Sequence, residues 1–334
     1  FKTLAVCQKG REKTYDKYYR SRNNKGIIDE VILVNNFKDI VNPEIQEKLR
    51  KKNTIFIHNR YFWVYCNFSE IENNFNVPIY GSRKMLKLEE RDVEKNQYYL
   101  LEKAGIRIPK LYSSPKEIDK LVIVKVNEAL RGYERAFFFA ASYDDYLNKS
   151  KELLDKENIT KEALDKAVIE EYILGAHVNF NFFYSVENEL ELMGTDTRRQ
   201  TNLDGILRLP ADEQLKVLKL IKPKIIESGH YAVTIKESLI EKAFDIGEKF
   251  VEITKQECSP GIIGPFALQG AVACQDGKEE LVIFDVSMRI PGSPGTKSTP
   301  YSGYLHGENL SYGERIAMDI KEAIEKGKLN RIIS

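Results

Sequence analysis

Short apolar runs alternate with helical segments through the first quarter of the chain. The runs that read as strands occupy residues 3–7, 31–34, 54–58 and 77–80. Between the second and third run, residues 43–52 carry Ile45 and Leu49 at the spacing of neighbours on one helix face. Strands that alternate with helices favour parallel βαβ units in an open sheet. We therefore expect the chain to begin with a Rossmann-like parallel α/β domain, although it has no GxGxxG motif.

Length and charge exclude several classes of protein. The chain has 334 residues, which at about 150 residues per domain suggests two domains or one large composite domain. Lys and Arg number 51 and Asp and Glu 50, so the net charge of +1 provides no long-range attraction to nucleic acid or to an anionic membrane. The longest strongly apolar stretch has about seven residues, whereas a membrane span needs about 20. We expect a cytoplasmic protein with neither a nucleic-acid nor a membrane partner.

The rest of the chain combines helical and strand patterns. Helices are expected at residues 89–105, 143–155, 160–166 and 237–254, and strands at 121–126, 136–140, 168–174, 178–185 and 190–195. Residues 264–273 and 280–290 favour a hairpin. Ser311 and Glu314 form a capping box that predicts the start of the last helix. Because Phe1 already opens a strand-like run, we expect a preceding segment of the natural protein to be missing.

Three segments in the middle of the chain are candidates for nucleotide binding. Lys125 ends a buried strand, where its ammonium could hold phosphate oxygens, although a solvated surface position is the alternative. Residues 127–135 follow as a flap with a single glycine, so their amides converge on phosphate less freely than those of a glycine-rich loop. Residues 170–175, Glu-Glu-Tyr-Ile-Leu-Gly, predict a hinge whose backbone could bind an adenine edge, or else a strand end with two solvated acids.

Two further segments are candidates for anion and metal binding. Residues 195–202 predict a polar loop with two arginines for bidentate anion contacts, or a plain surface loop. Gln269 lies on one strand of the expected hairpin, and Asp285, Ser287 and Arg289 alternate on the other, so these three share a face. Polar side chains in an apolar run are costly unless they line a site. Their oxygens suit Mg²⁺, which takes its remaining ligands from water and phosphate.

Taken together, these segments resemble an ATP-grasp ligase and, more narrowly, the archaeal PurP family. That family makes formamidoimidazole carboxamide ribonucleotide from formate, ATP and aminoimidazole carboxamide ribonucleotide. The stretches that carry the resemblance are residues 100–109, 122–125, 169–175, 183–185, 189–194, 202–204, 208–211, 263–269 and 284–289. The resemblance implies a pre-ATP-grasp α/β domain at residues 1–92, an ATP-grasp small subdomain with a phosphate flap at 93–175 and a large subdomain with the metal site at 176–334.

The resemblance also implies roles for individual residues. The ATP-binding residues would be Lys125, Arg131, Arg135, Glu170, Glu171, Tyr172, Ile173 and Gln200. Gln269 and Asp285 would hold Mg²⁺ or Mn²⁺. The residues that bind the other substrates would be His58, Arg60, Asn202 and His230, and those that act in catalysis Lys125 and Arg289. The reaction would pass through formyl phosphate and release ADP and phosphate, in a homo-oligomeric enzyme.

The chain departs from the family pattern at several positions. The flap is poor in glycine, Arg60 stands where the family has a serine, and His230 stands where it has an asparagine after glycine. Two alternatives therefore remain beside the PurP reaction. One is a paralogous ATP-grasp carboxylate–amine ligase with a different substrate pair. The other is a nucleotide-binding protein that has lost ligase activity.

Overall fold

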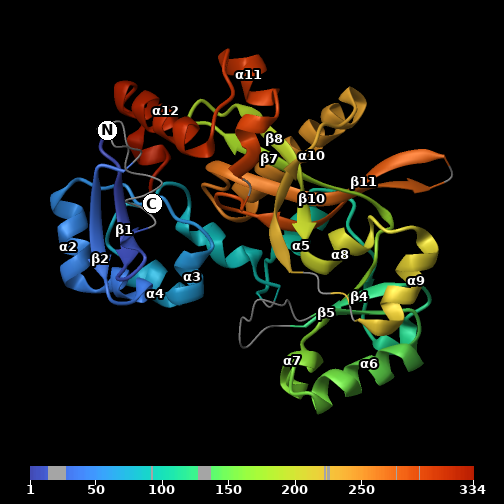
Figure 1. Cartoon of the computed structure of the whole chain (residues 1–334). Helices are drawn as coiled ribbons and strands as arrows, with labels where there is room; N and C mark the ends of the chain where they lie inside the picture. The colour runs from blue at the N-terminus through green and yellow to red at the C-terminus, as the bar shows by residue number, and fades with distance from the viewer. Residues whose placement is uncertain are drawn as a thin grey trace.

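The computed structural model describes residues 1–13, 28–91, 93–126, 137–221, 223, 226–275, 277–292 and 294–334. Within these residues the strands form a two-stranded sheet (β1-β2), a four-stranded sheet (β3-β6-β4-β5) and a five-stranded sheet (β11-β10-β7-β8-β9). Figure 1 shows the two-stranded sheet at one end of the molecule and the four-stranded sheet at the other. The five-stranded sheet lies between them.

The N-terminal part is a parallel α/β unit, as expected. Strand β1 (Leu4–Gln8) pairs in parallel with β2 (Glu30–Val34). The helices around them are η1 (Phe37–Val41), α2 (Pro43–Lys51), α3 (Tyr61–Tyr65) and α4 (Phe68–Asn73). The strands predicted at 54–58 and 77–80 are wrong in extent, because these residues form isolated bridges, a parallel one between Phe56 and Ile79 and an antiparallel one between Tyr80 and Ile333. Pro78 has no N–H to donate, so it interrupts a longer ladder.

The four-stranded sheet contains β3 (Leu111–Tyr112), β4 (Val122–Lys125), β5 (Phe137–Ala140) and β6 (Val168–Glu171). It packs against α6 (Tyr143–Asp155) and α7 (Lys161–Asp165), and η3 (Pro115–Glu117) lies before β4. Val122 and Val124 are fully buried in this core, so alternate residues of β4 face the helices. Strand β6 ends at Glu171 rather than at 174, and the next three residues connect it to the larger sheet.

The five-stranded antiparallel sheet contains β7 (Gly175–Tyr184), β8 (Leu190–Gln200), β9 (Glu227–Ala232), β10 (Gly264–Gln275) and β11 (Lys278–Ser287). Helices α5 (Gln97–Lys103) and α10 (Glu237–Glu257) cover one face, and the core between them contains Phe180, Phe182, Phe250 and Phe266. The predicted hairpin is confirmed as β10-β11. The predicted loop at 195–202 is wrong, because β9 pairs with this stretch and extends β8 as far as Gln200.

The remaining elements frame this sheet and extend from it. They are η2 (Arg83–Glu89), α8 (Thr201–Ile206), α9 (Ala211–Leu220), η4 (Pro294–Ser298), α11 (Tyr301–His306), α12 (Tyr312–Glu325) and η5 (Leu329–Arg331). The capping box of Ser311 and Glu314 is confirmed at the start of α12. The helix predicted at 89–105 begins only at Gln97, because Asn96 caps the backbone N–H groups of residues 98 and 99. Among the described helices, none has both the length and the apolarity to span a bilayer.

Candidate active site

A glutamine and a carboxylate face each other across the β10-β11 hairpin. Gln269 is the register partner of Asp285, and its Nε2 donates to Ser287 Oγ at 3.2 Å. The guanidinium of Arg198, from β8, donates to Gln269 Oε1 and lies 4.0 Å from Asp285 Oδ2. The side-chain oxygens of Gln269 and Asp285 thus both face the Arg198 guanidinium. An amide oxygen and a carboxylate oxygen fit Mg²⁺ or Mn²⁺, whose remaining ligands would come from phosphate and water.

The small number of carboxylates at this pair is consistent with a metal held partly by substrate. Among the residues that the structure describes, no group of three or more His, Cys, Asp or Glu side chains could hold a metal ion. A magnesium ion bound through one or two carboxylates relies on substrate phosphates to complete its shell. Gln269 and Asp285 therefore fit a metal that arrives with a nucleotide better than one held by the protein alone.

A chain of charged contacts connects Asp285 to the four-stranded sheet. Arg91 donates to Asp285 Oδ1 at 3.1 Å and to the hydroxyl of Tyr98 at 3.3 Å. The Tyr98 hydroxyl donates to Glu170 Oε2 at 2.5 Å, and Glu170 forms an ion pair with Lys125. Glu170 is only 2% exposed, so its charge requires these partners. In the described structure, the carboxylates of Asp285 and Glu170 thus balance the charges of Arg91 and Lys125.

Lys125 lies where the two larger sheets meet. Its Nζ is 3.3 Å from the carbonyl oxygen of Phe284 on β11 and 5.7 Å from the centre of the Phe284 ring. Burial lowers the pKa of Lys125, and the Glu170 carboxylate opposes this effect by favouring the ammonium. The lysine therefore bridges β4 and β11 as a partly desolvated cation, which strengthens any contact with an anion.

Aromatic side chains line the hinge between the sheets. Tyr172 contacts Phe139, with ring centres 5.0 Å apart, and His177, with ring centres 6.3 Å apart. His177 in turn contacts Phe284 at 5.4 Å. Ile173 is buried in a small apolar cluster beside them. An apolar aromatic surface at a hinge can accept a flat heteroaromatic ring such as adenine. Glu171, in contrast, is held by Lys120 at 2.9 Å.

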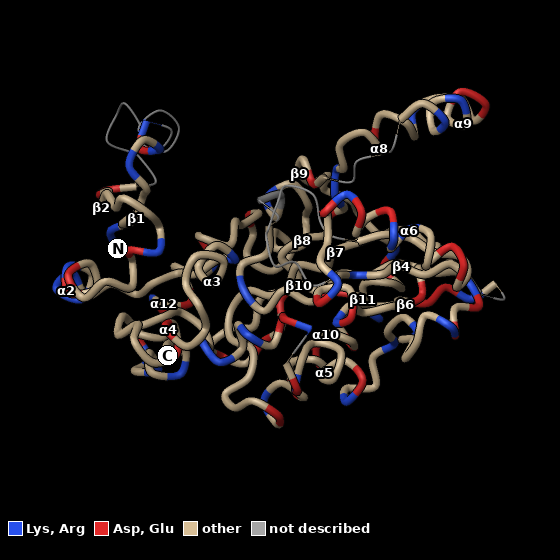
Figure 2. Tube along the Cα trace, turned by 90° about the horizontal axis from the view of Figure 1, so that it is seen from below, with Lys and Arg blue, Asp and Glu red and all other residues tan. Residues whose placement is uncertain are grey.

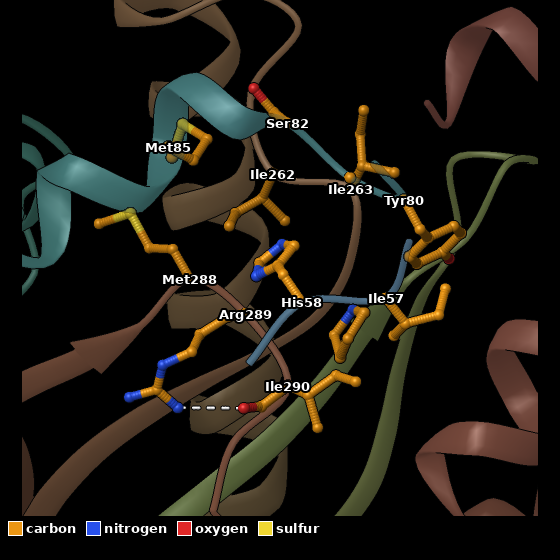
Figure 3. A pocket seen from close by; sticks show the side chains of 12 residues that line it. Ile57, His58, Tyr80, Ser82, Met85, Ile262, Ile263, Met288, Arg289 and Ile290 are labelled. Atoms are coloured by element: carbon orange, nitrogen blue, oxygen red, sulfur yellow. Dashed lines mark hydrogen bonds between the residues drawn. The ribbon is translucent and has the colours of Figure 1, made fainter. Parts of the chain in front are cut away.

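A pocket brings His58 and Arg289 together (Figure 3). Its other lining residues are Ile57, Tyr80, Gly81, Ser82, Met85, Ile262, Ile263, Pro265, Met288 and Ile290. His58 Nδ1 has no hydrogen-bond partner among the described residues, and burial lowers the pKa of His58 to about 3, with Arg289 acting in the same direction. The imidazole is therefore neutral. The Arg289 guanidinium lies over the Trp63 ring at 5.5 Å and donates to the carbonyl oxygen of Ile290 at 3.0 Å.

Glu89 supports the Arg289 side of this pocket. One carboxylate oxygen accepts the backbone N–H of Met288 at 2.6 Å, and the other lies 3.4 Å from Arg289 Nε. Burial raises the pKa of Glu89 to about 7, although the Arg289 charge acts in the opposite direction. Gln97 adds a second brace, because its Oε1 accepts the N–H of Val286 at 2.7 Å. These contacts fix the end of β11.

His230 connects to the candidate metal pair through a neighbouring carboxylate. Its Nδ1 lies 2.5 Å from Asp196 Oδ1 and its Nε2 lies 3.0 Å from Glu227 Oε1. Glu227 also lies 3.3 Å from Nε of Arg198, the arginine that contacts Gln269. Burial alone would lower the pKa of His230, but the two carboxylates raise it to about 9. The ring is therefore an imidazolium at neutral pH.

Other residues predicted from the sequence have fewer contacts with this site. Arg60, at the start of α3, is exposed, but its positive charge acts on Glu89 and opposes the rise of the Glu89 pKa. Asn202, on α8, is exposed as well. Gln200 ends β8, and its backbone N–H donates to the carboxylate of Asp204. The two arginines predicted to act from the flap, Arg131 and Arg135, lie outside the described residues.

Several residues of the site carry no local sequence signal. Arg91 precedes its partner Asp285 by 194 positions, and Glu89 precedes its partner Met288 by 199. Only the tertiary fold brings these residues, and Tyr98 with them, to the end of β11. Asp196 lies within the polar stretch at 195–202, but its role as a buried acceptor for Asn179 and Asn181 depends on pairing between β7 and β8.

Comparison with known proteins extends over the whole chain. A family described as "Domain of unknown function (DUF1297)" matches residues 145–334, and one described as "Protein of unknown function (DUF1246)" matches residues 1–112. The 5-formaminoimidazole-4-carboxamide-1-(beta)-D-ribofuranosyl 5'-monophosphate synthetase of Methanothermobacter thermautotrophicus is 40% identical over 338 residues. The alignment covers 100% of this chain and 88% of that protein.

Solved structures agree with this sequence relationship. The IMP biosynthesis protein PurP from Thermococcus kodakaraensis has a TM-score of 0.71 at 25% identity, with 100% of this chain and 93% of that chain covered. The biotin carboxylase-beta-gamma-ATP complex from Campylobacter jejuni has a TM-score of 0.58 at 15% identity, with coverage of 93% and 64%, and shares the fold. The chain therefore has the ATP-grasp fold and belongs to the PurP family of 5-formaminoimidazole-4-carboxamide ribonucleotide synthetases.

Proposed function

We propose that this protein is an ATP-dependent carbon–nitrogen ligase that formylates 5-aminoimidazole-4-carboxamide ribonucleotide in purine biosynthesis. Formate and ATP would be the other substrates, and ADP and phosphate the other products. Family membership supports the reaction. The observation that carries the assignment of the site is the convergence of Arg91 and Arg198 on Asp285, with Lys125 held nearby by Glu170.

The first chemical step activates formate. A formate oxygen attacks the γ-phosphorus of ATP, the bond from that phosphorus to the bridging oxygen breaks, and formyl phosphate and ADP form. Lys125 would exchange its contact with Glu170 for a contact with phosphate oxygens of ATP. Arg198 would likewise exchange Gln269 and Asp285 for phosphate oxygens. A divalent ion, Mg²⁺ or Mn²⁺, held by Gln269 and Asp285 would supply further neutralisation of the phosphates.

The second step transfers the formyl group. The substrate amine attacks the formyl carbon, the carbon–oxygen bond to phosphate breaks, and the departing phosphate takes up the proton that the nitrogen loses. Arg289 is the proposed donor to the oxyanion that develops on the formyl oxygen. Because the pKa of His58 is about 3, this imidazole would orient the reactants by hydrogen bonding rather than accept the proton. The buried position of both side chains would limit access of water to the anhydride.

The pocket of His58 and Arg289 is the proposed place for formate and the reacting amine. Arg289 offers the positive charge that a formate ion requires. Tyr172, Ile173 and Phe284 would hold adenine on the other side of Lys125. The location of such an enzyme would be the cytoplasm, where its nucleotide substrates are made.

One observation favours a second candidate, a ligase of the same fold that joins a different carboxylate and amine. Both ring nitrogens of His230 are engaged by carboxylates, so this position does not offer the amide donor and acceptor that an asparagine would. A changed contact at this position could select a different amine.

Product analysis separates these candidates. The protein is incubated with ATP, Mg²⁺, formate and 5-aminoimidazole-4-carboxamide ribonucleotide, and the mixture is analysed by mass spectrometry with parallel measurement of ADP. Formylated nucleotide in equal amount to ADP supports the PurP reaction. ATP binding without that product, but with ADP released in the presence of another carboxylate and amine, supports the second candidate. ATP binding with no turnover of any pair supports a protein without ligase activity.

A further inference from the structure

The hydroxyl of Tyr98 lies at the centre of the charged contacts between the two larger sheets. Helix α5 begins one residue before Tyr98, and Asn96 caps the backbone N–H groups of Tyr98 and Tyr99, which fixes this first turn. Figure 2 shows α5 beside α10 and near β11. Tyr98 is only 4% exposed, so its hydroxyl has to find hydrogen-bond partners within the protein.

Three hydrogen bonds fix the direction in which the Tyr98 hydroxyl points. Its oxygen lies 2.5 Å from Glu170 Oε2, and it lies 3.3 Å from both Arg91 Nε and Lys125 Nζ. An ionised carboxylate can only accept, and the two cations can only donate. The phenol proton therefore points at Glu170, and the lone pairs of the oxygen face the two cations. Burial raises the pKa of Tyr98, so the phenol keeps this proton at neutral pH.

The bond to Glu170 becomes more important when Lys125 leaves. In the structure, the ammonium of Lys125 and the hydroxyl of Tyr98 both contact the Glu170 carboxylate, one at each oxygen. Glu170 is 2% exposed, so a lost counter-ion leaves a buried charge that water does not reach. Tyr98 is carried by α5, whereas Lys125 is carried by β4. The hydroxyl can therefore stay with the carboxylate after the ammonium has moved to another anion.

The same hydroxyl also connects the lysine to the candidate metal pair. Arg91, which donates to the Tyr98 oxygen through Nε, donates to Asp285 Oδ1 through its terminal nitrogen at 3.1 Å. One neutral oxygen thus contacts the cation on the phosphate side and the cation on the metal side. It separates two like charges that would otherwise face each other within a buried space.

We propose that Tyr98 is a positioning residue for ATP binding, which stabilises the buried charge of Glu170 and so frees Lys125 to contact the phosphates. Tyr98 acts through Glu170 and Lys125 and need not contact the nucleotide itself. The inference rests on the proposed role of Lys125 in ATP binding. It does not depend on which carboxylate and which amine the enzyme joins.

Tyr98→Phe removes the hydroxyl and keeps the ring. In the free protein Lys125 still compensates Glu170, but in the ATP complex Glu170 loses the hydroxyl as well as the ammonium. A hydrogen bond to a buried charge is strong, so the dissociation constant of ATP should rise about tenfold or more. The rate at saturating ATP should change by less than about threefold, because the groups that face the reacting atoms are unchanged.

Isothermal titration calorimetry of the whole chain with ATP and Mg²⁺, without formate or amine, measures the dissociation constant. Tyr99→Phe is the matched control, because its hydroxyl lies 3.1 Å from Glu257 Oε2 on α10, away from Lys125. This control should bind ATP within about twofold of the wild type. Circular dichroism checks that each variant remains folded.

A double-mutant cycle separates positioning from a merely structural role. Glu170→Gln removes the charge that the Tyr98 hydroxyl stabilises, so in this background Tyr98→Phe should raise the dissociation constant by less than about threefold. Equal effects of Tyr98→Phe in the two backgrounds would overturn the proposal. An unchanged dissociation constant in Tyr98→Phe, or the same loss in Tyr99→Phe, would also overturn it.

The outcome for Tyr98 can be distinguished from the outcome for the reaction. A wild-type protein that binds ATP, shows the expected Tyr98 effects and forms no formylated nucleotide would contradict the proposed reaction and support this inference. Formylated product together with ATP binding that is indifferent to Tyr98→Phe would support the reaction and overturn the inference. A wild-type protein that does not bind ATP would overturn both.

Discussion

Gln269 and Asp285 face each other across the β10-β11 hairpin, and the guanidinium of Arg198 contacts both side chains. A positive group thus lies beside the two oxygens that are proposed to hold a metal ion. Asp285 also contacts Arg91, which leads through Tyr98 to Glu170 and the four-stranded sheet. Binding of a metal–nucleotide complex would exchange these internal ion pairs for contacts with phosphate. The two sheets would then be connected through the substrate instead of through protein charges.

Replacing Asp285 by Asn tests the metal assignment. The substitution preserves the shape of the side chain and removes the charge that the divalent ion requires, so turnover is expected to fall about 100-fold or more. Steady-state kinetics over a range of Mg²⁺ concentrations measures the loss. Glu279→Gln, at the opposite end of the same hairpin, serves as the control. Wild-type turnover in Asp285→Asn, in a folded protein, would show that Asp285 is not a metal ligand.

Glu89 is expected to make the free energy of unfolding depend on pH below neutrality. Its folded pKa of about 7 lies above the ordinary value of 4.5, so the folded protein binds more protons between these values. The resulting stabilisation is fully present below pH 4.5 and is lost as the pH rises through 7. Urea unfolding of the wild type and of Glu89→Gln at several pH values measures it. Parallel pH profiles for the two proteins would contradict the prediction.

His230 is expected to titrate in the alkaline range. Its folded pKa of about 9 exceeds the ordinary value of 6.5, so its contribution to stability is fully present below pH 6.5 and is lost as the pH rises through 9. Glu227→Gln removes one of the two carboxylates and should lower this pKa. Titration of the histidine ring protons by NMR provides the readout, with Glu213→Gln on α9 as control. A pKa near 6.5 for His230 in the wild-type protein would contradict the prediction.

A buried ion pair away from the site provides a prediction about stability. Glu191 accepts two hydrogen bonds from Arg315, at 2.7 and 2.5 Å, and both side chains are less than 5% exposed. Glu191→Gln leaves the guanidinium incompletely compensated, so the free energy of unfolding should fall by about 3–5 kcal/mol. Glu325→Gln, at an exposed position on α12, should change it by less than about 0.5 kcal/mol. Denaturant unfolding measures both, and equal effects would contradict the prediction.

The sequence predicted those parts of the fold that depend on local signals. The β10-β11 hairpin follows from two apolar runs around a turn, and α6 appears at residues 143–155 as the periodicity indicates. The capping box of Ser311 and Glu314 also forms as predicted, because its two residues are only three positions apart in the sequence. The domain boundaries at residues 92 and 175 stay a prediction, although α5 packs with α10 against the larger sheet.

The errors arose where neighbours distant in sequence decide the structure. Residues 195–200 are polar and read as a loop, but β9 supplies backbone partners and turns them into a strand. The partners of Asp285 and Arg289 could not be identified because Arg91 and Glu89 lie far away in the sequence, in segments without any repeated pattern. Periodicity describes which face a residue lies on, but it does not show which charges meet across that face.

The fate of the formate oxygens tests the central claim most directly. The enzyme is supplied with ATP, 5-aminoimidazole-4-carboxamide ribonucleotide and formate in which both oxygens are ¹⁸O, and the released phosphate is analysed by mass spectrometry. If formate attacks the γ-phosphorus, one ¹⁸O atom appears in each phosphate and the other remains in the formyl group. Formylated product accompanied by phosphate without ¹⁸O would contradict the account, because formyl phosphate could not then have been the intermediate.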